Sequence, residues 1–224
     1  FMIFIQLQKE TESVPKKILI KKANTSSSIV KQLVLKEFLV EVSKEESRIE
    51  TRNIQENIDQ LSPAQHGALE SIQGFFEEKK SVLLHGVTGS GKTEVYIQLI
   101  QKEIEQGNQV LYLLPEIALT TQIITRLRKK FGDKVGIYHS KYNSHERVEV
   151  WNELLKKDKS RFKVIIGARS AIFLPFHKLG LTVVDEEHDA SYKQQDPAPR
   201  YQGRDAAIFL SNIHEANVLL GSAT

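Results

Sequence analysis

The sequence contains no cysteine, so no disulfide and no cysteine-bound zinc can form within it. It has no apolar run of about 18 residues and nothing that resembles a cleavable signal, which predicts a soluble, intracellular chain without a membrane contact. Neither sign of charge dominates, because 31 Lys and Arg residues stand against 28 Asp and Glu. This balance permits an anionic partner without requiring one. With 40% hydrophobic residues, the 224-residue chain can bury a sizeable core.

Residues 1–50 predict a small, partial winged-helix domain. Two short helical patterns at 14–23 and 26–37 are separated by Asn24 and Thr25, which supply turn and N-cap chemistry. A strand-like segment follows, as in a helix-turn-helix with a wing. The basic residues available to DNA phosphates are Lys16, Lys17, Lys21, Lys22 and Lys31. A protein-docking domain with a solvated basic face fits the same pattern.

Residues 51–61 are predicted to be a polar linker, and residues 62–224 an α/β domain. Its first helix has Ser62 as N-cap and Pro63 in its first turn. Strand-like runs rich in Val, Ile and Leu follow at 81–86, 109–115, 134–139, 161–168, 181–185 and 216–221. Helical patterns lie near 92–106, 117–131, 145–158 and 204–213. Such strands, separated by helices, are typical of a parallel sheet with helices on both faces.

The segment GVTGSGKT, residues 86–93, matches the phosphate-binding pattern G-x-x-x-x-G-K-[ST] between a predicted strand and a predicted helix. Its glycines let backbone N–H groups surround phosphates, and the helix N-terminus adds its positive dipole end. Lys92 would reach the β- and γ-phosphates of ATP, and the Thr93 hydroxyl would bind Mg²⁺. The candidate nucleotide-binding residues are Gly86, Val87, Thr88, Gly89, Ser90, Gly91, Lys92 and Thr93. A glycine-rich turn without nucleotide is the alternative.

The predicted strand at 181–185 runs into five consecutive ionisable residues. Charges after a strand are often a solvated loop. The phosphate-binding pattern favours another interpretation, because such a loop needs a carboxylate at the end of a neighbouring strand to hold Mg²⁺. Asp185 is then the candidate metal ligand, and Glu186 the candidate base for the attacking water. Glu187 is assigned to solvent. Three roles are open for His188: it senses the γ-phosphate, links the site to a neighbouring domain, or forms a structural hydrogen bond.

These motifs combine with others into a family pattern: GVTGSGKT (86–93), LLPEIALT (113–120), YHS (138–140), GARSAIFLPF (167–176), DEEH (185–188), DASYKQQDPAPRYQGRDAA (189–207) and GSAT (221–224). Through these motifs the chain resembles superfamily 2 helicases, and in particular the PriA family of bacterial replication-restart helicases (primosomal protein N′). The resemblance covers essentially the whole chain. It implies a RecA-like helicase lobe at 62–224, ATP and Mg²⁺ as cofactors, and 3′→5′ unwinding of DNA. It also implies DNA forks, single-stranded DNA, primosome proteins and single-strand-binding proteins as partners, in a bacterial cytoplasm at the nucleoid.

The resemblance assigns roles to residues that composition alone would leave in a surface loop. Within 189–207, single-stranded DNA would meet two aromatic rings and three cations: Tyr192, Tyr201, Lys193, Arg200 and Arg204. The family's contacts with the DNA backbone are implied for Thr120, Arg169 and Ser170, and coupling of hydrolysis to movement for Ser222 and Thr224. Gln65 corresponds to an adenine-reading glutamine, although the third position of its helix also suits a capping-box glutamine.

Parts of the family pattern fall outside this sequence. They are an N-terminal fork-binding domain, a second lobe with its arginine finger, and a cysteine-rich zinc module. We therefore expect a fragment whose own hydrolysis is weak. A double-stranded DNA translocase, a P-loop kinase or GTPase, and a DNA-binding module without catalysis are the alternatives. The sequence lacks a guanine-reading N-K-x-D motif, and the intact candidate residues argue against lost catalysis.

Overall fold

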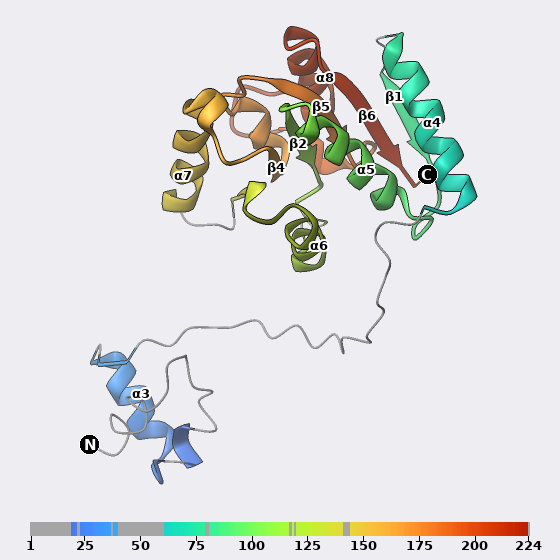
Figure 1. Cartoon of the computed structure of the whole chain (residues 1–224). Helices are drawn as coiled ribbons and strands as arrows, with labels where there is room; N and C mark the ends of the chain where they lie inside the picture. The colour runs from blue at the N-terminus through green and yellow to red at the C-terminus, as the bar shows by residue number, and fades with distance from the viewer. Residues whose placement is uncertain are drawn as a thin grey trace. The chain divides into compact units, whose positions relative to one another are not determined.

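The computed structural model describes residues 19–21, 23–36, 38–39, 61–78, 81–116, 118, 120–140 and 144–223. The chain divides into two compact units, residues 1–55 and residues 56–224, and each is described by itself (Figure 1). In the first unit, α3 (Ser27–Leu35) begins after its N-cap Ser26 and confirms the second predicted helix. Its buried Val30 packs with Leu19 and Ala23.

The winged-helix interpretation stays a prediction. Lys21 and Lys31 are exposed, as phosphate contacts would require. Most of the predicted wing and most of the predicted linker lie outside the described residues, as do Lys16, Lys17, Lys22 and Thr224.

The second unit has the predicted α/β fold. Its helices are α4 (Pro63–Glu77), α5 (Lys92–Glu105), α6 (Thr121–Phe131), α7 (Ser144–Leu155) and α8 (Gly203–Ile213), with short 3-10 turns η1 (Gly132–Lys134), η2 (Lys157–Lys159), η3 (Arg169–Phe173) and η4 (Ala190–Tyr192). Its strands are β1 (Val82–His85), β2 (Gln109–Leu113), β3 (Val135–Tyr138), β4 (Val164–Gly167), β5 (Leu179–Val184) and β6 (Asn217–Ser222). Within the described residues these six strands form one sheet in the order β1-β6-β5-β2-β4-β3, with every neighbouring pair parallel. All the predicted strands are therefore confirmed.

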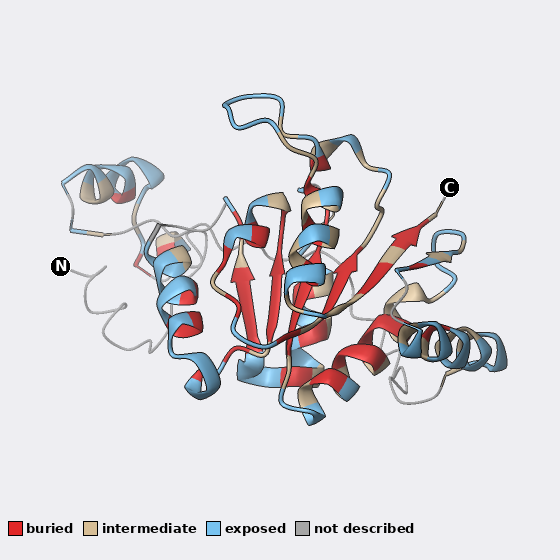
Figure 2. Ribbon diagram, turned by 90° about the horizontal axis from the view of Figure 1, so that it is seen from above, coloured by how far each residue is buried: buried red, intermediate tan, exposed pale blue. Residues whose placement is uncertain are grey.

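Helices cover both faces of the sheet, as the alternation of apolar residues along β2 shows. Val110 and Tyr112 face a core cluster completed by α5 and α6, whereas Leu111 and Leu113 face one completed by α7 and α8. Figure 1 shows α5 and α6 on one side of the sheet and α8 on the other. Figure 2 shows the strands buried between helices whose outer sides are exposed. A sheet covered in this way leaves the loops at the ends of its strands as the natural place for a site.

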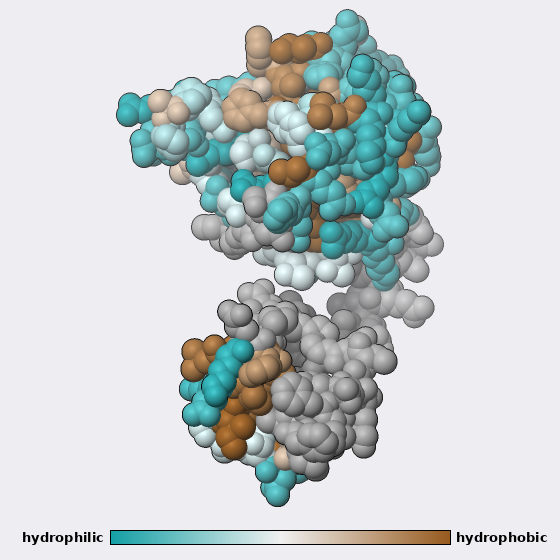
Figure 3. Space-filling view, turned by 90° about the vertical axis from the view of Figure 1, so that its left-hand side faces the viewer, coloured by the Kyte–Doolittle hydropathy of each residue, from teal (hydrophilic) through white to brown (hydrophobic). Residues whose placement is uncertain are grey.

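Apolar side chains also reach the surface of the second unit. Figure 3 shows them in small groups separated by polar side chains on the face that it presents. On α7, the exposed Val148, Trp151 and Leu155 recur at helical spacing. Among the described residues, no helix is long and apolar enough to cross a membrane.

The carboxyl ends of β1, β5 and β6 are joined by backbone hydrogen bonds. Gly86 N donates to Ser222 O at 3.0 Å, and Glu187 N donates to Gly221 O at 2.9 Å. The expectation that the carboxylate strand is the direct neighbour of the phosphate-loop strand is wrong, because β6 lies between β1 and β5. The two loops nevertheless meet at this edge because β6 binds both of them.

Candidate active site

The phosphate-binding loop, residues 86–91, presents an open backbone. Residues 87–90 are exposed. Gly89 and Gly91 have φ angles of 80° and 84°, a left-handed conformation that glycine adopts without strain. Among the described residues, no side chain caps the start of α5. Its first backbone N–H groups are thus available to an anion at the positive end of the helix dipole.

Lys92 begins α5, and its ammonium turns back toward the loop. Its Nζ donates to the carbonyl oxygen of Gly86 at 2.6 Å and lies 4.0 Å from Glu186 Oε1. The side chain is only 9% exposed, so this cation is confined between the phosphate-binding loop and the residues after β5. Thr93, the next residue, is half-buried in the same helical turn.

Gln65 forms the capping box that was one of its two predicted roles. Its Oε1 accepts a hydrogen bond from Ser62 N at 2.8 Å, and its own N donates to Ser62 Oγ at 3.3 Å. Its Nε2 also donates to the carbonyl oxygen of Gly91 at 3.3 Å, and a Cβ at Gly91 would collide with this amide. The start of α4 is therefore fastened to the phosphate-binding loop. Adenine reading by Gln65 stays a prediction.

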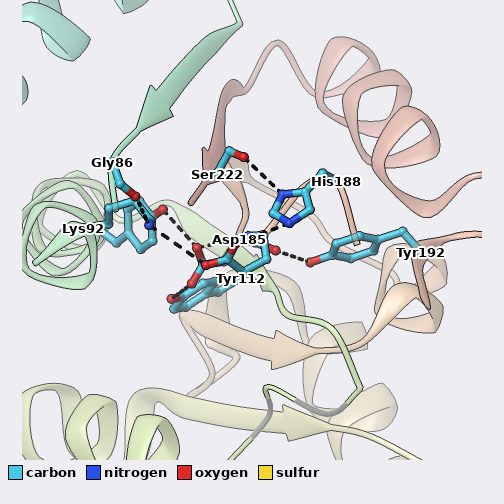
Figure 4. A network of polar contacts seen from close by, with 9 residues as sticks. Gly86, Lys92, Tyr112, Asp185, His188, Tyr192 and Ser222 are labelled. Carbon is cyan, nitrogen blue, oxygen red and sulfur yellow. Dashed lines mark hydrogen bonds and ion pairs between the residues drawn. The ribbon is translucent and has the colours of Figure 1, made fainter. Parts of the chain in front are cut away.

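Asp185, directly after β5, forms hydrogen bonds with three tyrosines, two of which, Tyr112 and Tyr192, are labelled in Figure 4. Its Oδ1 accepts from the Tyr96 hydroxyl and from Glu186 N, each at 3.1 Å, and its Oδ2 accepts from the Tyr112 hydroxyl at 3.1 Å. Its carbonyl oxygen accepts from the Tyr192 hydroxyl at 2.7 Å. Burial raises the pKa of the Asp185 carboxyl above its ordinary value, and the tyrosine hydrogen bonds oppose this rise. Burial also raises the pKa of Tyr96 and Tyr112 well above the ordinary value, so their hydroxyls remain protonated donors.

Glu186 and His188 connect the phosphate-binding loop to β6. Glu186 has a φ of 47°, an uncommon conformation for a residue other than glycine, and such conformations cluster at functional sites. Its Oε2 lies 3.8 Å from His188 Nε2, and His188 Nδ1 lies 3.1 Å from Ser222 Oγ. Figure 4 shows the imidazole beside the Ser222 side chain, with a dashed line between them. A row of polar side chains therefore runs from Lys92 to Ser222 across the sheet edge.

The assignment of Glu187 to solvent is wrong. Its side chain is only 16% exposed, and its Oε2 accepts from Arg204 Nη1 at 2.7 Å. Arg204 also donates to Asp205 at 2.8 Å. Arg204, which was predicted to contact DNA, is therefore engaged in tying the start of α8 to the loop after β5.

The aromatic-rich loop, residues 189–207, is closed on itself by backbone contacts. Lys193 bridges to Gln202, and Gln194 N donates to Tyr201 O at 2.8 Å. Arg169 was predicted to contact DNA, yet its Nη1 donates to two carbonyl oxygens of this loop, those of Ser191 at 2.8 Å and Lys193 at 3.2 Å. Arg169 therefore supports the loop from η3.

Base stacking on Tyr192 is contradicted by its burial. Its ring is 1% exposed, and its hydroxyl bonds to Asp185, so neither ring face is open to a base. Lys193 and Arg200 are exposed, and Tyr201 is half-buried with its ring against Phe173 at 5.2 Å between centroids. These three line an open hollow of about 1020 Å³. The loop thus has an outer side suited to an anionic strand and an inner side fixed to Asp185.

The remaining predicted residues lie at several places. Thr120 is the exposed N-cap of α6, Ser170 is exposed in η3, and Ser222 is buried at the end of β6. Ser222 joins the row that contains His188, whereas no hydrogen bond is described between Thr120 or Ser170 and that row.

A model of the family described as "DEAD/DEAH box helicase" matches residues 62–224. The chain belongs to this family. It is 39% identical to the replication restart protein PriA of Bacillus subtilis over 99% of this chain and 28% of that protein, and 41% identical to PriA of Chlamydia muridarum over 98% of this chain and 29% of that protein. The chain thus spans less than a third of the length of these relatives.

Solved structures show the same fold at low sequence identity. RecG bound to a three-way DNA junction is 20% identical with a TM-score of 0.55, over 100% of this chain and 26% of that one. The helicase MrfA bound to DNA and AMPPNP is 21% identical with a TM-score of 0.54, over 75% of this chain and 24% of that one. The α/β lobe of this chain is therefore a helicase fold.

Two residues of the site were missed from the sequence, Tyr96 and Tyr112. Both are flanked on either side by aliphatic residues, a pattern that indicates a place in the core. The available signal was that a fully buried tyrosine hydroxyl needs a hydrogen-bond partner, since phenylalanine would fill the same space without one. Nothing in the sequence names that partner, which is 89 residues away for Tyr96 and 73 for Tyr112.

The residues present fit the nucleotide that this family uses. The open backbone of the loop, the Lys92 ammonium and the uncapped helix suit phosphates. For Mg²⁺, the donors would be the Thr93 hydroxyl and the Asp185 carboxylate. Within the described residues, no group of three or more His, Cys, Asp or Glu side chains could hold a metal. One carboxylate and one hydroxyl fit Mg²⁺, which usually takes one or two carboxylates and completes its shell with phosphates and water.

Proposed function

We propose that the full-length protein is an ATP-dependent DNA helicase of replication restart, and that this chain supplies its phosphate-binding loop and its acidic residues. The observation that carries the proposal is the approach of Lys92 Nζ to Glu186 Oε1, 4.0 Å apart across β6. It brings a phosphate-binding cation and a candidate base to one point. The name of the two relatives, replication restart protein PriA, supports the proposed cellular process.

Each residue has a separate role in the proposed site. The backbone of residues 86–91 and the Lys92 ammonium bind the phosphates, and Thr93 and Asp185 hold Mg²⁺. When bound, Mg²⁺ would neutralise charge that develops on the phosphate oxygens. Glu186 orients the attacking water and accepts its proton. His188 links Glu186 to Ser222, and so to the strand that carries the GSAT motif.

DNA belongs on the outer side of the aromatic-rich loop in this proposal. Lys193 and Arg200 meet phosphates, and Tyr201 offers an aromatic edge to a base. Tyr192 does not touch DNA but transmits the position of the loop to Asp185 through its hydroxyl. DNA forks and single-stranded DNA are thus the proposed substrates, with movement 3′→5′, and primosome and single-strand-binding proteins the proposed partners at the nucleoid.

Strand displacement by the full-length protein tests this function. A forked duplex with one labelled strand should be separated only with ATP and Mg²⁺, and more rapidly when the single-stranded arm permits 3′→5′ movement. A Glu186→Gln variant should fail on the same fork. Displacement of a triplex-forming strand without separation of the duplex would instead identify a double-stranded DNA translocase and refute the helicase proposal.

A further inference from the structure

Two tyrosines hold the Asp185 carboxylate from opposite elements. Tyr96 lies on α5, one turn after Thr93, and Tyr112 lies on β2. Both are fully buried, with 0% exposure, and their rings meet edge to face at 5.8 Å between centroids with an interplanar angle of 78°. One hydroxyl donates to each carboxylate oxygen at 3.1 Å, so the carboxylate plane is fixed from both ends.

The donors are distributed unequally over the two oxygens. Oδ1 accepts from the Tyr96 hydroxyl and from Glu186 N, whereas Oδ2 accepts only from the Tyr112 hydroxyl among the described residues. Each carboxylate oxygen has about two lone-pair positions. Oδ1 is therefore saturated, and Oδ2 keeps one acceptor position whose direction is set by the Tyr112 hydroxyl.

Gly221 provides the space for this arrangement. A Cβ at Gly221 would collide with the Tyr96 hydroxyl and lie 2.9 Å from Asp185 Oδ1. Only glycine lets the end of β6 approach so closely. The tyrosine pair is thus built around the carboxylate and is more than a hydrophobic filling of the core.

We infer that Tyr96 and Tyr112 are positioning residues that orient the Asp185 carboxylate and leave one lone pair of Oδ2 for Mg²⁺. The inference rests on the proposed function, because it requires nucleotide and Mg²⁺ at this edge. Groups that orient a metal ligand from behind typically change metal affinity about 10- to 100-fold when removed. Tyr112 has the larger effect, because Glu186 N still holds Oδ1 when the Tyr96 hydroxyl is lost.

The test is the affinity of the full-length protein for a fluorescent non-hydrolysable ATP analogue, measured across a Mg²⁺ titration and in EDTA. The variants are Tyr96→Phe and Tyr112→Phe. The matched control is Tyr138→Phe, which removes a hydroxyl from β3, separated from β5 by β2 and β4. We expect the Mg²⁺ concentration for half-maximal affinity to rise about 10-fold or more in Tyr112→Phe and less in Tyr96→Phe. Affinity in EDTA should stay at the wild-type value in both, because Lys92 and the loop backbone are untouched.

Two results would overturn the inference. One is a Mg²⁺ dependence in Tyr112→Phe equal to that of Tyr138→Phe. The other is an equal loss of affinity with Mg²⁺ and in EDTA, since this would mean that the hydroxyls only support packing. In both cases the wild type still binds the analogue with Mg²⁺, and the proposed function stands. A wild type that binds no analogue at all would refute both.

Discussion

The two loops that meet at the carboxyl edge of the sheet are built in opposite ways. The phosphate-binding loop after β1 is exposed along residues 87–90 and presents its backbone. The acidic loop after β5, residues 185–188, presents side chains, and each of them has a described partner: tyrosine hydroxyls on Asp185, Lys92 and His188 beside Glu186, Arg204 on Glu187 and Ser222 beside His188.

The difference shows how the proposed phosphate-binding element and the proposed catalytic element can share one edge of the sheet. A phosphate needs many N–H donors and a cation, which an open loop at a helix start supplies. A metal ligand and a base need fixed directions, because a small displacement of a reacting group is costly to the rate. The side chains of the acidic loop form hydrogen bonds with α5, β2, β6 and α8, so elements on both faces of the sheet hold this loop in place.

The largest expected effect separates binding from chemistry. In the full-length protein, Glu186→Gln should lower ATP turnover by about 10²- to 10⁴-fold, because the proton acceptor is lost. Nucleotide affinity should change little, since the loop backbone and Lys92 remain. Lys92→Ala should instead weaken nucleotide affinity, because it removes the cation that faces the phosphates. Steady-state ATPase rates measure turnover in both variants, and binding of a non-hydrolysable ATP analogue measures nucleotide affinity. Normal turnover by Glu186→Gln would refute the role of Glu186 as the proton acceptor.

A smaller effect is expected on the outer side of the aromatic-rich loop. Arg200→Ala should weaken single-stranded DNA binding similarly for all sequences and reduce the salt slope by about one, as the loss of one phosphate contact does. Arg128→Ala, which removes an exposed cation from α6, is the control. Binding isotherms at several salt concentrations give the slopes. Equal slopes for Arg200→Ala and the wild type would remove Arg200 from the DNA surface.

The smallest effect concerns a carboxylate away from this edge. Glu153 on α7 accepts from Lys156 Nζ at 2.5 Å and from Arg161 N at 3.0 Å, and these hydrogen bonds lower its pKa from the ordinary 4.5. A lowered folded-state pKa stabilises the protein above the ordinary pKa, and that contribution is lost as the pH falls through the folded-state pKa. The melting temperature of Glu153→Gln should therefore be slightly lower than that of the wild type at pH 7. The difference between the two melting temperatures should disappear below about pH 4.5. Thermal melts against pH test this, and a gap that widens on acidification would contradict it.

The fold was predictable because its signals are local. The phosphate-binding pattern, the strands rich in Val, Ile and Leu and the Ser62–Pro63 helix start each depend on a few adjacent residues, and the structure confirms the parallel sheet and the capping box. The strand order was not predictable in the same way, because insertion of β6 between β1 and β5 depends on pairing between distant segments.

The sequence named most residues of the candidate site, but it did not predict most of the contacts that these residues make. Their motifs singled out five residues that lie together in the structure: Lys92, Asp185, Glu186, His188 and Ser222. The family resemblance assigned Arg169, Tyr192 and Arg204 to contacts with DNA. Their roles inside the protein depend on partners such as the Asp185 carbonyl and Glu187, which only the folded chain brings near.

The central claim is that the acidic loop joins the proposed ATP site to the aromatic-rich loop. The Tyr192→Phe variant tests this claim most directly. This change removes only the hydroxyl that donates to the Asp185 carbonyl at 2.7 Å and leaves the buried ring in place. The measurement is the ATPase rate of the full-length protein against single-stranded DNA concentration. We predict that the maximal stimulation by DNA falls about 2- to 10-fold, as expected for one hydrogen bond, while direct DNA binding stays at the wild-type value. Superimposable curves for Tyr192→Phe and the wild type would contradict the claim.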